Sequence, residues 1–325
     1  MKKILVTGGC GFIGSNFIRY LIHTYPEYKI INLDKLTYAG NPENLRDIEK
    51  DAHYKFVQGD ICNQRIVKRL LKEVEVVINF ASETHVDRSL HNANNFLRTN
   101  FYGTYVLLEG VRERKIKLYL QISTDEVYGS REKGFFSESS PLNPTNPYSV
   151  SKASADLLVL SYYRTYKIPV IIARSSNNFG PYQYPEKIIP LFITQLLENR
   201  KVPLYGEGKN IRDWLYVLDN VSALTLLMHK GKQGEIYNIS AGNFLSNLQL
   251  TRILLRLLGK KEDFIKYVPD RPGHDFRYAI DSNKIRNLGW RPKYDFLSAL
   301  KETVEWYKAN RSWWEPLKLE RMEVW

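Results

Sequence analysis

The sequence predicts an α/β protein: a Rossmann-type, doubly wound parallel sheet followed by a smaller, interleaved α/β C-terminal substrate domain. Short apolar runs rich in β-branched residues alternate with longer segments of helical period from residue 3 to about residue 174, as in a parallel sheet covered by helices on both faces. A glycine-rich turn follows the first apolar run, and Asp34 ends the second. This order of strand, glycine turn, helix, strand and acid is typical of a dinucleotide-binding fold.

The elements follow from the apolar pattern. Strands are expected where apolar and β-branched residues run together: Lys3–Thr7, Ile30–Asp34, Lys55–Gln58, Val76–Phe80, Leu118–Ser123 and Val170–Arg174. Helices are expected in the segments of helical period between them: Phe12–His23, Arg65–Lys72, Asn94–Arg114 and Tyr148–Tyr166. These helices are long enough to serve as right-handed crossovers between parallel strands.

The pattern changes after Arg174, where proline and glycine become frequent. We predict an NAD-binding domain over residues 1–175 and a second domain over residues 176–325, with a segment at about 217–240 returning to the first. Because no Ser/Gly-rich linker separates them, we expect the two domains to interleave around a shared cleft. The tail from about Asn310, with Trp313, Trp314 and Trp325, carries no recognisable motif, and we expect it to pack on the surface.

Composition narrows the possible functions. The chain has 325 residues, 43% of them hydrophobic, and no apolar run approaches the roughly 18 residues of a membrane span. The first apolar run stops at Gly8, too early for a signal peptide, so we expect a cytoplasmic protein without a membrane partner. Cys10 and Cys62 lack neighbours at metal-ligand spacing, which predicts no metal site. The net charge of +12 is scattered, so we expect no nucleic-acid partner.

The clearest motif is the turn Gly8–Gly14 (GGCGFIG), directly after the first predicted strand. Its glycines let the chain turn tightly and let backbone N–H groups approach a pyrophosphate at the helix N-terminus. Asp34 stands 20 positions after Gly14, where a carboxylate would bind the ribose hydroxyls and repel the extra phosphate of NADP. The motif therefore predicts NAD as the cofactor, with Asp60, after the third strand, near the adenine.

Tyr148 and Lys152 lie four positions apart at the start of a predicted helix. Side chains at this spacing share one face, so the ammonium can lie near the phenol. A neighbouring cation favours the phenolate and is expected to lower the pKa of Tyr148 from about 10 toward the range of a general base. Together with the NAD motif, the pair predicts hydride transfer of the dehydrogenase type.

Two adjacent carboxylates follow the predicted strand Leu118–Ser123, in the sequence Thr124-Asp125-Glu126. Ligands of open parallel sheets bind at the carboxyl ends of the strands. We therefore expect Asp125 and Glu126 to face the cleft rather than to cap the next element or face solvent.

Several further segments resemble a known family: Asp34–Asn41 (DKLTYAGN), Ala81–Arg88 (ASETHVDR), Ser123–Gly129 (STDEVYG), Asn146–Lys152 (NPYSVSK), Asn177–Lys187 (NNFGPYQYPEK), Ile211–Tyr216 (IRDWLY) and Asp270–Asp275 (DRPGHD). With them the chain resembles the extended short-chain dehydrogenases/reductases and, within these, the dTDP-glucose 4,6-dehydratases. The glycine motif and Tyr-x-x-x-Lys identify only the superfamily, whereas Thr-Asp-Glu and DRPGHD are more specific. Ser82 and Thr84 depart from the family, which usually has Ala and Ser there.

The resemblance implies conversion of dTDP-glucose to dTDP-4-keto-6-deoxyglucose and water through bound NAD, which is regenerated in each cycle. It implies that Tyr148, with Lys152 near it, takes the proton of the carbon 4 hydroxyl, and that Thr124 is also a catalytic residue. The ketone acidifies the carbon 5 hydrogen, which Glu126 removes, and a protonated Asp125 helps the carbon 6 hydroxyl leave as water. Each such proton transfer contributes about 10²- to 10⁴-fold.

The resemblance also implies which residues line the site. The cofactor would contact Gly8, Gly11, Phe12, Ile13, Gly14, Asp34, Lys35, Leu36, Thr37, Asp60, Ile61, Phe80, Ala81, Ser82, Glu83, Thr99, Tyr148, Lys152 and Asn178. The sugar nucleotide would contact Thr84, Thr124, Asn177, Lys187, Ile188, Pro203, Leu204, Tyr205, Arg212, Asn247, Asp270, Arg271, Pro272, Gly273 and His274. Lys187, Arg212 and Arg271 are suitable partners for its pyrophosphate.

Alternatives stay open at this point. Another NAD-dependent enzyme acting on a UDP sugar, a 4-epimerase or a decarboxylase, would share the fold, although Asp125 argues against both. A non-catalytic NAD- or RNA-binding protein on the same fold is suggested only by the charge. The helices Asn94–Arg114 and Tyr148–Tyr166 carry apolar residues on more than one face, which predicts a homodimer through a four-helix bundle. The family further implies a role in making deoxysugars such as rhamnose.

Overall fold

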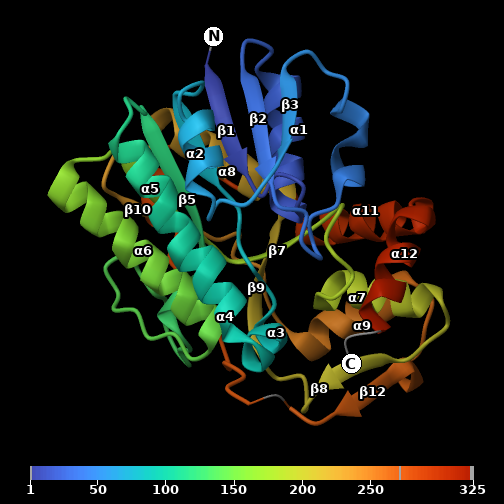
Figure 1. Ribbon diagram of the computed structural model, residues 1–325. Helices are drawn as coiled ribbons and strands as arrows, with labels where there is room; N and C mark the ends of the chain where they lie inside the picture. The colour runs from blue at the N-terminus through green and yellow to red at the C-terminus, as the bar shows by residue number, and fades with distance from the viewer. Residues whose placement is uncertain (1, 271, 323–325) are drawn as a thin grey trace.

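A single parallel sheet of seven strands organises the computed structural model, which describes residues 2–270 and 272–322 (Figure 1). Its strand order is β10-β6-β5-β4-β1-β2-β3, and every pairing is parallel. The bounds are β1 (Lys3–Thr7), β2 (Lys29–Asp34), β3 (Tyr54–Gln58), β4 (Val76–Asn79), β5 (Leu118–Thr124), β6 (Val170–Ser175) and β10 (Ile236–Ile239). The predicted Rossmann-type fold class is confirmed, and all six predicted strands are present.

Helices cover both faces of this sheet, and β1 shows how the sequence achieves this. Ile4 and Val6 point to one face, where they belong to the same core cluster as Phe17 of α1, whereas Leu5 joins Leu107 of α5 on the other face. Because both faces are buried, the strand is a continuous apolar run rather than an alternating one. One face carries α1 (Phe12–Thr24) and α8 (Val217–Lys230), and the other α2 (Gln64–Leu70), α5 (Thr104–Arg112) and α6 (Pro147–Tyr166).

The helix expected over Asn94–Arg114 is divided in the structure. It consists of α4 (Ala93–Phe96), a π-helical stretch η2 (Leu97–Gly103) and α5. Over η2 the backbone hydrogen bonds skip one residue more than in an α-helix, a feature that the apolar period does not reveal. Short elements complete this part: η1 (Pro42–Ile48), α3 (Val86–His91) and η3 (Asp125–Tyr128).

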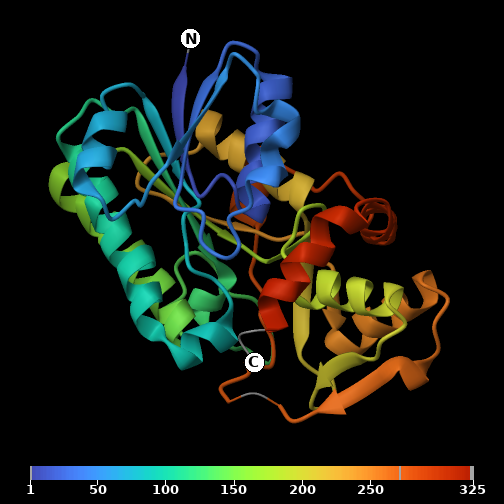
Figure 2. The same ribbon diagram turned by 45° about the vertical axis from the view of Figure 1, so that its right-hand side comes forward.

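The remaining elements surround the carboxyl ends of the sheet strands (Figure 2). Three strands, β7 (Asn177–Phe179), β9 (Ile211–Tyr216) and β11 (Phe244–Ser246), form a second sheet, and β8 (Val202–Tyr205) pairs with β12 (Ile265–Val268). The helices are α7 (Ile188–Leu197), α9 (Asn247–Leu257), η4 (Glu262–Phe264), α10 (Asn283–Asn287), α11 (Phe296–Ala309) and α12 (Arg311–Met322). Among residues 2–270 and 272–322, no helix combines the length and apolarity needed to cross a membrane.

The tail does not pack on the surface as predicted. Trp314, on α12, is fully buried, and its Nε1 donates to the carbonyl oxygen of Tyr307 at 2.8 Å. Trp313 donates through Nε1 to Oδ1 of Asn44 at 2.9 Å. Large aromatic side chains bury enough apolar surface to fix a terminal helix. Trp325 lies outside the described residues.

Candidate active site

The glycine turn between β1 and α1 leaves space for a ligand at the start of α1. Gly8 has a left-handed φ of 69°, and a Cβ there would lie 2.6 Å from the nitrogen of Ala81. A Cβ on Gly14 would lie 2.4 Å from the Gly8 oxygen. Only glycine fits at these two positions. Within the described chain no side chain caps α1, so its first N–H groups can bind an anion such as a pyrophosphate.

Asp34 holds this turn against the end of β2. Its Oδ2 accepts a hydrogen bond from the Cys10 N–H at 2.9 Å, and its Oδ1 accepts one from the Leu36 N–H at 2.8 Å. Burial raises the pKa of Asp34, although these backbone donors oppose the rise. Leu36 does not line the cavity beside it, contrary to the prediction, because its side chain packs against the hydrophobic core.

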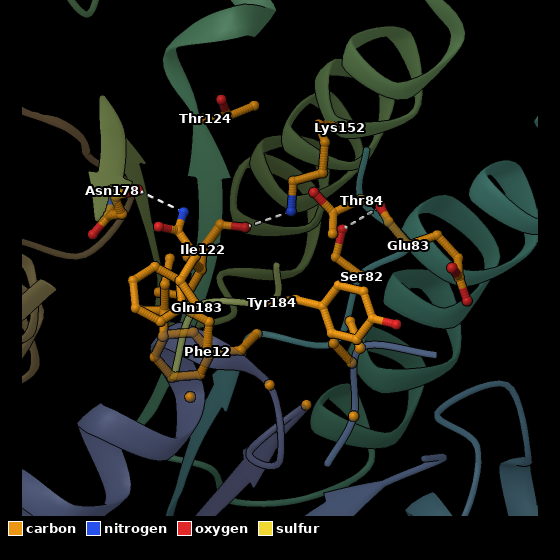
Figure 3. A pocket seen from close by; sticks show the side chains of 18 of the residues that line it. Phe12, Ser82, Glu83, Thr84, Ile122, Thr124, Lys152, Asn178, Gln183 and Tyr184 are labelled. Atoms are coloured by element: carbon orange, nitrogen blue, oxygen red, sulfur yellow. Dashed lines mark hydrogen bonds between the residues drawn. The ribbon is translucent and has the colours of Figure 1, made fainter. Parts of the chain in front are cut away.

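A cavity of about 340 Å³ opens above the glycine turn, and we call it the cofactor cavity (Figure 3). Its volume is within the range of ligand pockets. Apart from Leu36, every residue that the sequence assigns to the cofactor lines it: Gly8, Gly11, Phe12, Ile13, Gly14, Asp34, Lys35, Thr37, Asp60, Ile61, Phe80, Ala81, Ser82, Glu83, Thr99, Tyr148, Lys152 and Asn178.

The cofactor cavity also has walls that the sequence analysis missed. Ser123 is the last residue but one of β5, and Ser175 ends β6; the rule for parallel sheets could have indicated both. Gln183, Tyr184 and Glu186 come from the loop after β7; they lie within the family-like segment Asn177–Lys187, which could have indicated them, but the sequence analysis did not assign them to the site. The other missed residues are Leu33, Ala39, Gly40, Gly59, Ile122, Ser176, Ile189 and Trp214.

The start of α6 places Tyr148 and Lys152 in this cavity. The Asn146 side chain accepts a hydrogen bond from the Ser149 N–H, a capping box that fixes where the helix begins. Lys152 Nζ donates to the carbonyl oxygen of Ile122 on β5 at 2.6 Å (Figure 3). Burial lowers the pKa of Lys152 to about 8.

The pKa of Tyr148 shifts in the direction opposite to the prediction. Burial raises it, and the negative charge of Glu126 raises it further. Hydrogen bonds with Thr84 and Thr124 act the other way but do not compensate. The expectation that Lys152 lowers the pKa of this phenol is wrong for this structure, because burial and the carboxylates dominate.

The two carboxylates occupy η3, directly after β5. Asp125 is 2% exposed, and burial together with the charge of Glu126 raises its pKa well above the usual value. Thr124 Oγ1 donates to Asp125 Oδ1 at 3.2 Å and accepts a hydrogen bond from the Glu126 N–H at 3.2 Å. Asp125 Oδ2 is buried without a hydrogen-bond partner among the described residues, so it can carry a proton for transfer.

A second cavity of about 850 Å³ adjoins the first, and we call it the substrate cavity. Nine of the residues assigned to the sugar nucleotide line it: Asn177, Lys187, Ile188, Pro203, Leu204, Tyr205, Arg212, Asn247 and His274. Thr84 and Thr124 line the cofactor cavity instead. The two cavities share Glu126, Asn177, Glu186, Lys187, Ile188 and Trp214, which therefore form their junction.

Four predicted substrate residues lie outside both cavity walls or outside the described residues. Asp270, Pro272 and Gly273 line neither cavity, and Arg271 is not among the described residues. Asp270 is half-exposed, and its Oδ1 lies 2.6 Å from His274 Nδ1, so it orients a lining residue rather than lining the cavity itself.

The guanidinium of Arg212 donates hydrogen bonds to backbone carbonyl oxygens. Its Nη1 donates to the carbonyl oxygen of Ile211 at 2.8 Å, and its Nη2 to that of Asp275 at 2.9 Å. Its guanidinium carbon also lies 4.2 Å from the centre of the Tyr278 ring. Its charge still lowers the pKa of Asp125 against the larger effect of burial. Arg212 thus contributes a fixed positive charge close to the carboxylates.

The substrate cavity has further walls that the sequence analysis did not assign to the site, although three of them lie within the family-like segment Ala81–Arg88. Glu315 and Lys318 come from α12, the tail that carried no motif. The others are His85, Val86, Asp87, Leu191, Phe192, Gln195, Glu198, Arg200 and Tyr278. Within the described ranges, no group of histidine, cysteine, aspartate or glutamate side chains is arranged to hold a metal ion.

Comparison with known proteins agrees with this geometry. The sequence model of the GDP-mannose 4,6 dehydratase family matches residues 5–303. A dTDP-glucose 4,6-dehydratase of Streptomyces niveus is 49% identical over 97% of this chain and 96% of its own. The crystal structure of DesIV, a dTDP-glucose 4,6-dehydratase from Streptomyces venezuelae with NAD and TYD bound, has a TM-score of 0.95 at 47% identity and covers 97% of this chain and 99% of its own.

A second solved structure is similar to a comparable degree. The dTDP-glucose 4,6-dehydratase of Bacillus anthracis in complex with NAD has a TM-score of 0.92 at 50% identity, covering 98% of this chain and 100% of its own. The chain therefore belongs to the GDP-mannose 4,6-dehydratase family and, within it, to the dTDP-glucose 4,6-dehydratases.

Proposed function

We infer that this chain is an NAD-dependent dTDP-glucose 4,6-dehydratase, which converts dTDP-glucose to dTDP-4-keto-6-deoxyglucose and water. One observation carries the proposal: Asp125 and Glu126 are adjacent in the wall of the cofactor cavity that Tyr148 also lines, and Glu126 lines the substrate cavity as well. Elimination of water needs an acid and a base as well as the oxidising site. A 4-epimerase needs no such acid, so the pair favours the dehydratase.

The residues around the cofactor cavity fit NAD. The glycine turn admits the pyrophosphate, because a Cβ at Gly8 or Gly14 would collide with neighbouring backbone. Asp34 keeps further lone pairs for ribose hydroxyls, and its charge disfavours the 2′-phosphate of NADP. When bound, NAD supplies a reversible two-electron acceptor, which oxidises carbon 4 and later reduces carbon 6.

Tyr148 is proposed to take the proton of the carbon 4 hydroxyl. Its hydrogen bonds with Thr84 and Thr124 favour the phenolate, and Lys152, held by the Ile122 carbonyl, adds a positive charge on the same helix face. The two threonines oppose burial, which otherwise keeps the phenol protonated.

Glu126 and Asp125 are proposed to divide the elimination between them. A ketone at carbon 4 acidifies the carbon 5 hydrogen, which the Glu126 carboxylate removes. Burial and the charge of Glu126 raise the pKa of Asp125 well above the usual value, which favours its protonated form, and we propose that it gives this proton to the departing carbon 6 hydroxyl. Two neighbouring carboxyls with different environments thus take opposite roles.

The test is incubation of the purified protein with dTDP-glucose, without added oxidant or reductant, followed by mass spectrometry. We expect loss of one water to give the 4-keto-6-deoxy sugar. If dTDP-glucose stayed unchanged while UDP-glucose was converted, the proposed nucleotide, with thymine as its base, would be wrong. Epimerisation without loss of water would overturn the roles given to Asp125 and Glu126.

We also propose a homodimer formed through α5 and α6 with the segment before α5. Three apolar side chains on these helices are exposed to solvent: Phe101 is 39%, Val150 40% and Leu157 58% exposed. Exposed apolar side chains that lie together are typical of a protein interface. Helices that present apolar side chains outward can pair with the same helices of a second copy. Light scattering at micromolar concentration is expected to give the mass of two chains, and the mass of one chain would reject the dimer.

Two further proposals concern organisation. We propose that residues 1–175 with a segment at about 217–240 bind NAD, and that the rest of residues 176–325 binds the sugar nucleotide. A cytoplasmic location is also proposed, since Cys10 and Cys62 are both free thiols. Labelling of both thiols in protein taken directly from cells would agree with this location, and a disulfide would not.

A further inference from the structure

A partly buried polar network lies beside the junction of the two cavities, and of its residues the mechanism above uses only Thr84. We call it the Tyr38 network; it consists of Tyr38, Thr84, Arg88 and Glu186. Tyr38 lies in the loop after β2, Thr84 and Arg88 lie between β4 and the end of α3, and Glu186 lies just before α7. It thus joins three segments that are far apart in the sequence.

The contacts within the network are short. Tyr38 Oη lies 2.9 Å from Oε1 of Glu186 and 3.0 Å from the carbonyl oxygen of Thr84. Arg88 donates through Nε to Oε2 of Glu186 at 3.2 Å, and its guanidinium lies 3.8 Å from the centre of the Tyr38 ring. The single hydroxyl proton of Tyr38 is therefore shared between a carboxylate and a backbone carbonyl, which fixes Thr84 relative to Glu186.

The ion pair between Arg88 and Glu186 is partly removed from solvent, which costs desolvation free energy. The Glu186 side chain is 3% exposed and that of Arg88 24%. Burying an ion pair costs desolvation that apolar residues of the same size would avoid, so such pairs add little net stability and can instead specify one geometry. His85, directly after Thr84, has a left-handed φ of 79°, a conformation that a residue other than glycine keeps only when its surroundings impose it.

The network acts on groups that face the reaction. Thr84 and Tyr148 line the same cavity, where the Thr84 side chain acts to lower the pKa of the Tyr148 phenol, and Lys187 Nζ lies 3.5 Å from Thr84 Oγ1. Glu186 and Lys187 are adjacent and line both cavities. A displacement of Thr84 would therefore move the partner of the catalytic phenol. Figure 3 draws Thr84 and Lys152 among the side chains that line the cofactor cavity.

We propose that Tyr38, Arg88 and Glu186 are positioning residues, which hold Thr84 so that it aligns the sugar's carbon 4 hydroxyl with Tyr148. This rests on the proposed dehydratase function and goes beyond it, because none of the three touches the reacting atoms. Tyr38 and Arg88 line neither cavity, and of the three only Glu186 borders the substrate cavity. We therefore expect their loss to act more on oxidation at carbon 4 than on capture of the nucleotide.

The experiment compares Tyr38→Phe, Glu186→Gln and the double variant with the wild type. Tyr28→Phe is the matched control, because Tyr28 is also a buried tyrosine with a hydrogen bond, 2.7 Å to Nε2 of His229, but it lies outside both cavities. For each protein, kcat and KM for the sugar nucleotide that the wild type converts are measured. The isotope effect of deuterium at carbon 4, dTDP affinity, bound NAD and melting temperature complete the set.

We expect Tyr38→Phe to lower kcat about tenfold, the effect of one charge-assisted hydrogen bond. Its isotope effect should increase, while dTDP affinity stays within about twofold of wild type. The double variant should be no slower than the slower single variant, because the residues act as a unit. Tyr28→Phe should leave kcat and the isotope effect unchanged.

Two results would overturn the proposal. One is a Tyr38→Phe protein with reduced melting temperature but unchanged kcat and isotope effect, which is the behaviour of a purely structural residue. The other is a loss of dTDP affinity as large as the loss of kcat, which would mean that the network shapes the nucleotide site. A wild type that converts UDP-glucose instead of dTDP-glucose would refute the proposed substrate, while the variant-to-wild-type ratios would still decide on the network.

Discussion

The two cavities of this protein are built in different ways. The cofactor cavity is lined mainly by the carboxyl ends of strands β1 to β6 and by the turns that follow them. The substrate cavity draws its walls from loops, from α7, β8 and β9, and from α12 at the far end of the chain. The comparison teaches that the sheet edge determines where chemistry occurs, whereas recognition of the substrate depends on how distant segments pack.

The largest expected effect tests the first half of this comparison. Glu126→Gln should lower the rate of water loss about 10²- to 10⁴-fold, the contribution of one placed proton-transfer group. Binding of dTDP should change little, because the amide keeps the shape of the side chain. Mass spectrometry of the product and dTDP titration measure the two quantities. Glu132→Gln, at an exposed position, is the control. If Glu126→Gln lost water at the wild-type rate, Glu126 at the carboxyl end of β5 would have no catalytic role.

The next effect tests the second half, through the tail. Trp314→Ala leaves a cavity at a fully buried site and should reduce the free energy of unfolding by ~3–5 kcal/mol. The affinity for dTDP should fall with it, because Glu315 and Lys318 of the same helix line the substrate cavity. Urea denaturation and dTDP titration measure these losses. Trp314→Phe should have most of the wild-type stability. If Trp314→Ala bound dTDP with wild-type affinity, α12 would not contribute to nucleotide binding.

A smaller effect concerns the cost of chemistry at the sheet edge. The pKa of Asp125 is raised in the folded protein, so this group stabilises the fold fully below its unfolded value of about 3.9 and loses that contribution as the pH rises through the folded value. Asp125→Asn cannot ionise, so its free energy of unfolding does not fall with rising pH for this reason. The variant should be more stable than wild type at pH 7 by ~1–3 kcal/mol, while it loses activity. Thermal melts at pH 4 and pH 7 check the sign, and a variant that is less stable at pH 7 would contradict it.

The smallest effect lies where the two regions meet. Trp313→Phe removes the 2.9 Å hydrogen bond to Asn44 but keeps an aromatic ring. Stability should fall by ~0.5–1.5 kcal/mol, as for one ordinary hydrogen bond. Chemical denaturation gives this value. Equal stability of the variant and wild type would mean that the bond contributes nothing measurable.

The sequence predicted the N-terminal half well because its signals are local. The Gly8–Gly14 turn, Asp34 and the apolar runs follow directly from backbone geometry, and the positions of Asp125 and Glu126 follow from the sheet rule. The direction of the Tyr148 pKa could not be predicted, because it depends on burial by segments distant in sequence. The roles of Glu186, Tyr278 and Lys318 in the cavity walls were missed for the same reason.

The bond between Trp313 and Asn44 has a consequence for biosynthesis. Asn44 Nδ2 also donates to the carbonyl oxygen of Cys10 at 2.9 Å, so the glycine turn is supported by a residue 269 positions downstream of Asn44. Translation proceeds from the N-terminus, and early segments fold first. A nascent chain can therefore form the sheet and the glycine turn long before Trp313 emerges, and the ribosome must complete almost the whole polypeptide before that support is in place.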